Sequence, residues 1–349
     1  MSHPVVNLSE ICWPKQWKTI SASALLEEGF PVYGANGKIG FFSEFTHENP
    51  TLMITCRGAT CGNVHISEPK SYINGNAMAL DDLDHSKVDI RYLYYFFKKR
   101  GFSDVISGSA QPQITRQGLT KVTVPLPSLK EQQRIAAILD KADVIRRKRQ
   151  QAIALADEFL RAVFLDMFGD PNANPQNVEV LPMTEIFNIK TGSLNSNAAV
   201  ESGKYPFFTC AKEIYAIDDF AFDQESLLLA GNNAQADYDV KHYKGKFNAY
   251  QRTYVLSLKD ESWSYPFYKF ALEYQLSNLK RFSKGSNTKY ITMEIMSRTL
   301  LPVPEPDKQK GFVEFFEKIS SIRSSQNSGI LQDVELAEST SQKAFSGRL

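Results

Sequence analysis

The longest regular pattern of apolar positions runs from Leu129 to Phe168, in the middle of the chain. No glycine or proline interrupts this stretch, and residues with high helix propensity dominate it. Its apolar residues alternate at spacings of three and four with one polar break at Arg149, which is typical of a coiled-coil seam. The pattern predicts a helix about 60 Å long that needs an apolar partner of similar length. The predicted seam consists of Ile135, Ile138, Ala142, Ile145, Arg149, Ala152, Ala156, Phe159 and Val163.

A second copy of this seam follows later in the chain. Adding 177 to a residue number of the first copy, the repeat offset, gives the matching residue of the second copy and takes Arg149 to Gln326. The two polar residues that it relates are predicted to cross and fix the register of an antiparallel helix pair. The repeat offset also takes the segment 108–115 to 285–292, so the chain is predicted to be an internal duplication. The second seam consists of Phe312, Phe315, Ile319, Ile322, Gln326 and Leu336.

The stretches before each long helix are predicted to be globular and to mix helices with strands. In the first, a β-prone apolar run at 51–56 leads into a glycine-containing polar loop at 57–63, and a short amphipathic helix is predicted at 90–100. The second repeats this order loosely, at 226–233 and 263–275. The predicted fold class is α+β, with two globular α/β domains separated by two long antiparallel coiled-coil helices and related by a pseudo-two-fold duplication. The predicted divisions are 1–127, 128–170, 171–304 and 305–349.

Composition adds few constraints. The 349 residues include 42% hydrophobic ones, which is ample for packed cores, and the 40 basic and 39 acidic residues leave a net charge of +1. A balanced charge neither indicates nor excludes nucleic-acid binding, because clustering on one face matters more than the sum. The four cysteines show no metal-ligand spacing. No secretion signal or apolar run of membrane-spanning length occurs, so a cytoplasmic location is predicted, with no membrane partner.

Catalytic motifs are absent from the sequence. The Gly-Lys pairs lack the spacing of a phosphate-binding loop, and no Asn/Asp-Pro-Pro-aromatic motif for methylation of amino groups is found. The five histidines are scattered and none begins an HExxH motif. The sequence thus predicts a binding protein with no catalytic residue and no metal site.

Loops rich in Arg, Lys, Asn, Gln, Ser and Gly suit the base edges and phosphates of DNA. Two similar domains on an antiparallel helix pair would read two half-sites along a duplex. In the second domain, basic residues between 241 and 290 are interleaved with aromatic ones, which favours phosphate contact. The candidate DNA-binding residues are Arg57, Thr60, Asn63, Ser109, Gln111, Gln113, Arg116, Asn232, Asn233, Lys244, Lys246, Arg252, Lys284, Ser286, Asn287, Thr288 and Lys289.

Other interpretations stay open. The glycine-containing loops are also compatible with plain turns, and the basic run Arg146–Arg149 is more typical of a solvated or partner-facing helix surface than of a DNA clamp. The alternative function is a duplicated coiled-coil scaffold whose globular ends bind other proteins, which the near-zero net charge favours slightly. Salt-sensitive binding to duplex DNA would separate the two. An enzyme with an unfamiliar site is the third interpretation.

Several short segments resemble one protein family. They are the loop Gln111-Pro112-Gln113-Ile114, the junction VPLP at 124–127 followed by LKEQQRI at 129–135, the helix end FLDMFGDP at 164–171 and the C-terminal SQKAFSG at 341–347. Over essentially its whole length the chain resembles the DNA-specificity subunit of type I restriction-modification systems. The second junction, at 304–310, keeps only the outline, so the second long helix is expected to dock slightly differently.

The resemblance implies that each globular domain is a target recognition domain and each long helix a conserved region. Together they would read a split, asymmetric DNA sequence, with the helix length setting the spacer. The expected partners are double-stranded DNA, two methyltransferase (modification) subunits and restriction/translocase subunits. No cofactor is expected in this chain, whereas S-adenosylmethionine, Mg and ATP are expected on the partner subunits. The Arg146–Lys148 surface is then expected to face a partner.

Overall fold

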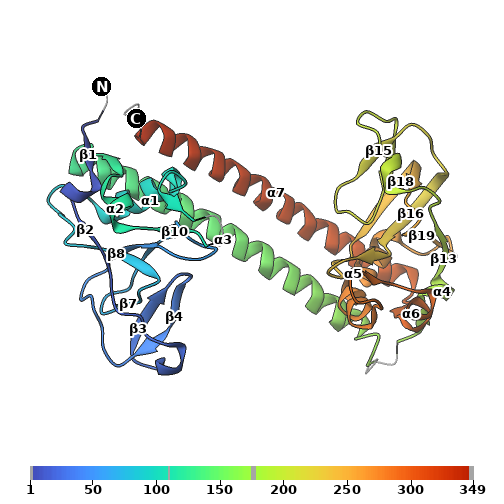
Figure 1. The fold of residues 1–349 in the computed structure, drawn as a ribbon. Coiled ribbons are helices and arrows are strands. Elements are labelled where there is room, and N and C mark those ends of the chain that lie inside the picture. The colour runs from blue at the N-terminus through green and yellow to red at the C-terminus, as the bar shows by residue number, and fades with distance from the viewer. Residues whose placement is uncertain (1–2, 109–110, 174–177, 346–349) are drawn as a thin grey trace. The chain divides into compact units, whose positions relative to one another are not determined.

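The computed structural model describes residues 3–108, 111–173 and 178–345. They form two compact units: the first combines Met1–Gln151 with Asn327–Leu349, and the second is Ala152–Gln326 (Figure 1). Each unit contains one globular part and one half of each long helix, so the units divide inside the long helices. The predicted domain boundaries stay a prediction, and the α+β fold class is confirmed.

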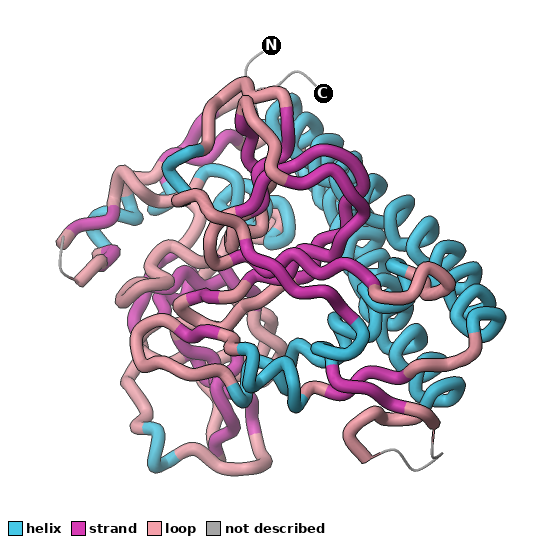
Figure 2. The backbone as a smooth tube through the Cα atoms, turned by 90° about the vertical axis from the view of Figure 1, so that its right-hand side faces the viewer, coloured by secondary structure: helices cyan, strands magenta, loops and turns pink. Residues whose placement is uncertain are grey.

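The two long helices have the predicted bounds. Helix α3 spans Leu129–Phe168 and helix α7 spans Pro306–Phe345, so the repeat offset holds at both ends. Within each unit, the halves of α3 and α7 run side by side in opposite directions (Figure 1, Figure 2). The predicted duplication therefore extends to the length of the helices.

Part of the predicted seam is wrong by one position. Ile138, Ile145, Phe159, Ile322 and Leu336 are 37% to 65% exposed, and Ala152 is exposed as well, whereas Phe315 is half-buried against the core of the second unit. Adjacent residues such as Leu139 and Leu160 are buried instead, because each belongs to the core of its globular part. Phe159 and Leu160 are both apolar, so the sequence pattern allows either residue to occupy the seam. Packing against the globular part buries Leu160 and leaves Phe159 exposed. The buried and half-buried seam is Ile135, Leu139, Ala142, Arg146, Arg149, Ile153, Ala156, Leu160, Val163 and Met167 on α3, and Phe312, Phe316, Ile319, Arg323, Gln326, Ile330, Asp333, Ala337, Thr340 and Ala344 on α7.

The polar break in the first seam has a different partner from the predicted one. Arg149 Nε lies 3.1 Å from Asp333 Oδ2 in the first unit, and this ion pair replaces the predicted crossing with Gln326. A side chain on Gly329 would occupy the place of the Arg149 guanidinium. The glycine that weakens helix propensity in α7 is therefore what makes room for the buried part of Arg149.

The globular part of the first unit contains two small sheets and a covering helix. One sheet has the antiparallel order β2-β8-β5-β6, and the other has the order β4-β3-β7 with β3 and β7 parallel. Helix α1 presents Tyr92, Leu93 and Phe97 to a core that also takes in Ile135 and Leu139 of α3. The elements are β2 (Trp13–Gln16), β3 (Phe30–Gly34), β4 (Gly37–Phe42), β5 (Leu52–Thr55), β6 (Val64–Ile66), β7 (Tyr72–Ile73), β8 (Ala77–Asp81) and α1 (Ile90–Arg100).

The second unit builds a different sheet beside an equivalent helix. Its six strands have the order β13-β19-β16-β18-β14-β15, antiparallel except for β14 and β18. Helix α5 packs with Phe164 and Phe168 of α3 and Phe312 of α7 in one core. The elements are α4 (Met183–Ile186), β13 (Phe187–Thr191), β14 (Tyr205–Phe208), β15 (Tyr215–Ile217), β16 (Phe222–Ala230), β18 (Val240–Ala249), β19 (Thr253–Leu258) and α5 (Tyr265–Phe282).

A frame of short elements is common to both units. A two-stranded ladder leads into each long helix, β1 with β11 in the first unit and β12 with β21 in the second. A short helix precedes the last strand of each ladder, and Thr115 and Thr292 cap these helices by accepting a backbone N–H. The elements are β1 (Val5–Asn7), β9 (Ile106–Ser107), β10 (Gln113–Ile114), α2 (Arg116–Thr120), β11 (Thr123–Pro125), β12 (Val180–Pro182), β17 (Asn232–Asn233), β20 (Lys289–Tyr290), α6 (Met293–Arg298) and β21 (Leu300–Pro302).

Candidate nucleic-acid interface

Two loops that are distant in the sequence meet on the first globular part. The Gly58 N–H donates to the Pro112 carbonyl at 3.2 Å, and the Ile114 N–H donates to the Cys56 carbonyl at 3.0 Å. A β-bridge also joins Arg57 to Gln113. The structure therefore brings the loop at 57–63 together with residues 111–114 as one surface.

Most of the candidate residues of the first unit have exposed side chains on this surface. Arg57, Asn63, Gln111, Gln113 and Arg116 are exposed, whereas Thr60 is half-buried. The Thr60 hydroxyl donates to the Ala35 carbonyl at 3.4 Å, so it braces the loop. Ser109 lies outside the described residues. The exposed set offers the guanidinium and amide groups that pair with base edges and phosphates.

An aromatic residue that the sequence analysis did not single out adjoins this surface. Trp13 lies on the edge strand β2, is 46% exposed, and carries the Arg116 guanidinium over its ring at 4.7 Å. A cation–π contact of this kind holds the guanidinium flat while its N–H groups stay free for another partner. In the sequence, the signal for Trp13 was its position next to Pro14 on a short strand, since neighbouring residues of a strand face opposite sides and Pro14 is buried.

The second globular part repeats the arrangement with different side chains. Asn232 and Asn233 pair with Tyr290 and Lys289 in the β17–β20 ladder, and the Ile291 N–H donates to the Gly231 carbonyl at 2.9 Å. Lys284, Ser286, Asn287 and Thr288 are exposed on the loop that the β-bridge between Lys284 and Tyr290 closes, and Lys289 is half-buried. Arg252 is exposed, and its carbonyl accepts the Gly231 N–H at 2.9 Å. These candidates therefore converge as in the first unit.

One glycine shapes each hairpin loop. Gly108 and Gly285 have φ angles of +84° and +104°, which side-chain-bearing residues rarely adopt. A Cβ atom on Gly108 would also approach the Gln111 carbonyl oxygen to 2.6 Å. The repeat offset relates these two glycines, and both have left-handed backbone conformations.

Lys244 and Lys246 do not join the other candidates. Both lie on β18 opposite Glu225 and Asp223, toward the end of β16 that is remote from Ala230 and the Asn232 loop. Lys244 Nζ lies 2.9 Å from a Glu225 carboxylate oxygen, and Lys246 Nζ lies 4.6 Å from the centre of the Phe220 ring. The predicted basic segment is therefore not one surface, because strand pairing separates residues that are close in sequence.

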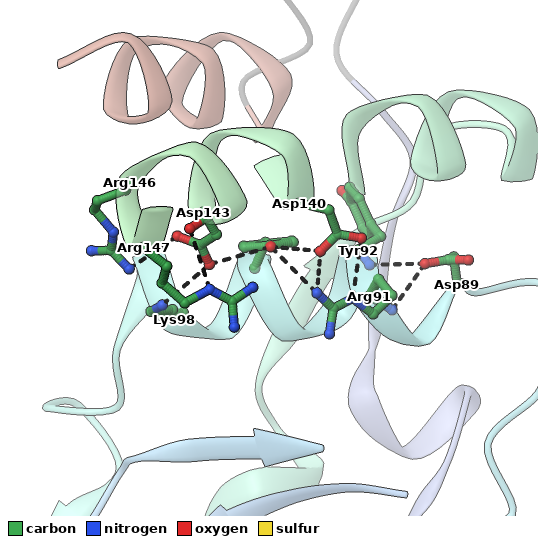
Figure 3. Close-up of polar contacts among 9 residues, drawn as sticks. Asp89, Arg91, Tyr92, Lys98, Asp140, Asp143, Arg146 and Arg147 are labelled. Carbon is green, nitrogen blue, oxygen red and sulfur yellow. Dashed lines mark hydrogen bonds and ion pairs between the residues drawn. The ribbon is translucent and has the colours of Figure 1, made fainter. Parts of the chain in front are cut away.

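A polar network docks helix α1 on helix α3 (Figure 3). The Arg91 guanidinium binds the Asp140 carboxylate, and the Tyr95 hydroxyl donates to Asp140 Oδ1 at 2.6 Å and to Asp143 Oδ2 at 3.3 Å. Burial raises the pKa of Asp140, but the hydrogen bonds from Arg91 and Tyr95 outweigh it and lower the pKa below its usual value. Lys98 Nζ lies 3.9 Å from Asp143. Charge pairing therefore fixes this helix contact.

The same network changes the interpretation of the basic run on α3. Arg146 binds Asp143 at 3.1 Å, and the Arg147 Nε–H donates to the Asp143 carbonyl at 3.3 Å (Figure 3). Arg146 is half-buried in the seam, whereas Arg147 and Lys148 are exposed. Arg146 is thus engaged in intramolecular contacts, and Arg147 and Lys148 are the exposed residues of the surface expected to face a partner, which stays a prediction.

The second unit docks its helix on α3 through aromatic rings. Phe164 lies 5.2 Å from Phe270 and 5.5 Å from Phe312, centroid to centroid, and Phe270 lies 5.1 Å from Phe312. The contact at Phe164 is not the counterpart of the contact at Asp140, because the repeat offset takes Asp140 and Phe164 to Glu317 and Ser341 on α7. The two units therefore differ in the chemistry of their contacts with α3.

The described residues form neither a metal-ligand cluster nor a membrane-spanning helix. No group of three or more His, Cys, Asp or Glu side chains in residues 3–108, 111–173 and 178–345 is arranged to hold a metal ion. Within the same ranges, no helix combines the length and apolar character needed to cross a membrane.

Comparison with known proteins accounts for the duplicated frame. A family described as type I restriction modification DNA specificity domain matches residues 4–155 and again residues 175–336. The chain belongs to this family. The two matches coincide with the two copies that the repeat offset defines.

Relatives of this specificity-domain chain include two type I restriction enzyme specificity subunits. The EcoDI subunit of Escherichia coli is 36% identical over 138 residues, which are 39% of this chain but only 29% of that subunit. The MjaIX subunit of Methanocaldococcus jannaschii is 24% identical over 311 residues, 77% of this chain and 71% of that subunit. The fold resembles the crystal structure of the type I restriction-modification S subunit from M. genitalium, with a TM-score of 0.70, 15% identity, and 98% and 96% of the two chains covered.

Proposed function

We propose that this chain is the non-catalytic DNA-recognition subunit of a type I restriction-modification complex and reads a bipartite, asymmetric DNA target. The observation that carries the proposal is the pair of equivalent surfaces, each made of a loop after a buried strand and a glycine-shaped hairpin. The family membership supports the same assignment.

The two surfaces would read different sequences because their side chains differ. The first surface offers Arg57, Gln113 and Arg116, and the second offers Asn232 and Lys289 at its converging loops. Arginine favours guanine, and asparagine and glutamine favour adenine, in bidentate major-groove contacts worth about 1–3 kcal/mol each. Two surfaces of one frame with unlike side chains therefore suit two unlike half-sites.

Exposed apolar residues on the long helices support binding of two copies of one modification subunit. The first unit exposes Ile145 and Leu336, and the second exposes Ile322 and Phe159. The repeat offset relates Ile145 to Ile322 and Phe159 to Leu336, so each unit offers an equivalent pair. Exposed apolar residues grouped on a helix face are typical of a protein interface. S-adenosylmethionine, ATP and Mg would then be bound by the methyltransferase and restriction subunits.

Co-expression with a type I modification subunit tests the proposal. Sequencing that maps methylated adenines should find them confined to one bipartite motif. The proposal would be contradicted if the chain formed no such complex, left no methylation pattern and did not bind duplex DNA at low salt. That result would favour a protein scaffold.

A further inference from the structure

A buried glutamine occupies the same place in both copies of the frame. Gln132 on α3 and Gln309 on α7 are 0% and 1% exposed. The repeat offset relates them, and each lies near the start of its long helix. A buried side-chain amide is costly unless its donors and acceptor are used. Both side-chain amides are therefore expected to have hydrogen-bond partners inside the protein.

Each glutamine joins three parts of its own unit. Gln132 Oε1 accepts the Asp89 N–H at 2.8 Å, while its Nε2 donates at 2.9 Å to the Lys87 and Pro127 carbonyls. Asp89 is the N-cap of α1, and Pro127 ends the junction before α3. The long helix, the junction and the start of the domain helix thus meet on one side chain.

The second unit repeats this contact. Gln309 Oε1 accepts the N–H of Ser264, the N-cap of α5, at 3.0 Å, and Nε2 donates to the Pro304 carbonyl at 2.9 Å. The surrounding sequences differ, EQQR at 131–134 and KQKG at 308–311. Both glutamines nevertheless bind the N-cap N–H of the domain helix and the proline carbonyl of the junction, and Gln132 also binds the Lys87 carbonyl. Two contacts of the first long helix therefore recur in the second, and the expected slight difference in docking stays a prediction.

Glutamine is well suited to this position among the ordinary residues. Its acceptor and its donors face a backbone N–H and one or two backbone carbonyls at the same time. A glutamate carboxylate would turn an acceptor toward those carbonyls, and a leucine would leave the backbone groups without a partner. Asparagine is one methylene shorter and cannot span both sets.

The domain helix that each glutamine holds leads toward the candidate surface of its unit. Helix α1 has 11 residues and ends at Arg100, before β9 (Ile106–Ser107), and α5 has 18 residues and leads directly into the loop at 284–290. At 1.5 Å per residue these helices are about 16 Å and 27 Å long. A tilt of about 10° at the glutamine would move the far ends by roughly 3 Å and 5 Å, compared with a rise of about 3.4 Å per base pair.

We propose that Gln132 and Gln309 are positioning residues that set the angle of each DNA-reading surface on its long helix and so set the spacer length that the chain accepts. This inference rests on the proposed function, because a spacer exists only if the chain reads two half-sites. The glutamines touch no DNA. Their effect is on where the two surfaces fall along the duplex.

The test uses the chain in complex with its modification subunits and three duplexes. The duplexes carry both half-sites, as mapped by methylation, separated by the native spacer or by one base pair more or fewer. Binding is compared for wild type, Gln132→Leu, Gln132→Asn and Gln309→Leu. Exposed neighbours provide matched controls, Gln133→Leu for the first unit and Lys310→Leu for the second.

The positioning role predicts that both Gln132 variants and Gln309→Leu lose about tenfold in preference for the native spacer, while the control variants keep the wild-type preference. A general loss of structure would weaken binding to all three duplexes alike. If the Gln132 and Gln309 variants bind with wild-type preference, the positioning role is overturned although the proposed function stands. If the wild-type complex itself shows no spacer preference, the bipartite reading fails, and the positioning role fails with it. If Gln132→Leu does not fold, the comparison of Gln132→Asn with the Gln133→Leu control decides the test.

Discussion

Replacing Gly329 by alanine sets two effects of similar size against each other in the first unit. Inside a helix, alanine is more favourable than glycine by about 1 kcal/mol. The added methyl group would coincide with the Arg149 guanidinium, which must then move. Movement breaks the 3.1 Å ion pair between Arg149 and Asp333. The sign of the net effect therefore depends on what that ion pair contributes.

The structure sets the size of that contribution. The Arg149 and Asp333 side chains are 30% and 19% exposed. Exposed ion pairs contribute about 0–1 kcal/mol, whereas removing one partner of a fully buried pair costs about 3–5 kcal/mol. A half-buried pair falls between these limits, at about 1–2 kcal/mol. Gly329→Ala should thus be neutral or destabilise the first unit by up to about 1 kcal/mol, but should stabilise an Arg149→Ala chain by about 1 kcal/mol.

Tryptophan fluorescence can report on this unit alone. The chain has three tryptophans, and Trp263→Phe leaves only Trp13 and Trp17, both in the first unit. Urea unfolding of the four chains of the Gly329–Arg149 double-mutant cycle in this background gives the coupling free energy. If Gly329→Ala changes stability equally with and without Arg149, the guanidinium does not occupy the space beside Gly329.

Four further substitutions test other contacts. Because the folded-state pKa of Asp140 is lowered, its carboxylate stabilises the first unit above the unfolded-state pKa of about 3.9, and this contribution is lost as the pH falls through the folded-state pKa. Asp140→Asn should therefore lower stability at pH 7 and flatten its loss on acidification below about pH 4, and parallel stability curves for the two chains would refute this. Phe164→Ala should destabilise the second unit by about 3–5 kcal/mol, read from Trp263 in a chain whose other tryptophans are phenylalanine, because its ring lies in the Phe270–Phe312 cluster. Trp13→Ala should weaken cognate DNA binding about tenfold while Trp17→Phe has no effect, and unchanged affinity for Trp13→Ala would remove that residue from the interface. Ile145→Asp should lower the number of bound modification subunits by one in native mass spectrometry, and full occupancy would place the partner elsewhere.

The sequence predicted the features that depend on local patterns. The bounds of α1 and α3 follow from helix propensity and the absence of glycine and proline, and the duplication follows from a single offset. The side of each seam was not predictable, since Phe159 and Leu160 are both apolar and only the core of the globular part distinguishes them. Periodicity alone does not choose between adjacent apolar residues.

The candidate interface was predicted in part for a related reason. Loop residues such as Gln113 and Asn232 were found by type and by their place after a strand or before a helix. Lys244 and Lys246 lie apart from the other candidates because their distance from the loops is set by the β16–β18 ladder, which is a non-local pairing, and their DNA contact stays a prediction. Trp13 and Gln132 were missed because exposure and buried hydrogen bonding are properties of the fold rather than of a motif.

The contrast between the two helix-docking contacts has a consequence for how solvent acts on the molecule. In the first unit, Arg91, Tyr95 and the half-exposed Asp140 add an ionic contact to the apolar packing of α1, and added salt screens that ionic contact. The second unit holds α5 through the Phe164, Phe270 and Phe312 rings, which salting-out anions such as sulfate strengthen. Chloride and sulfate should therefore shift the order in which the two recognition surfaces loosen on heating. A duplicated frame thus gives a chain whose two ends respond differently to the same buffer.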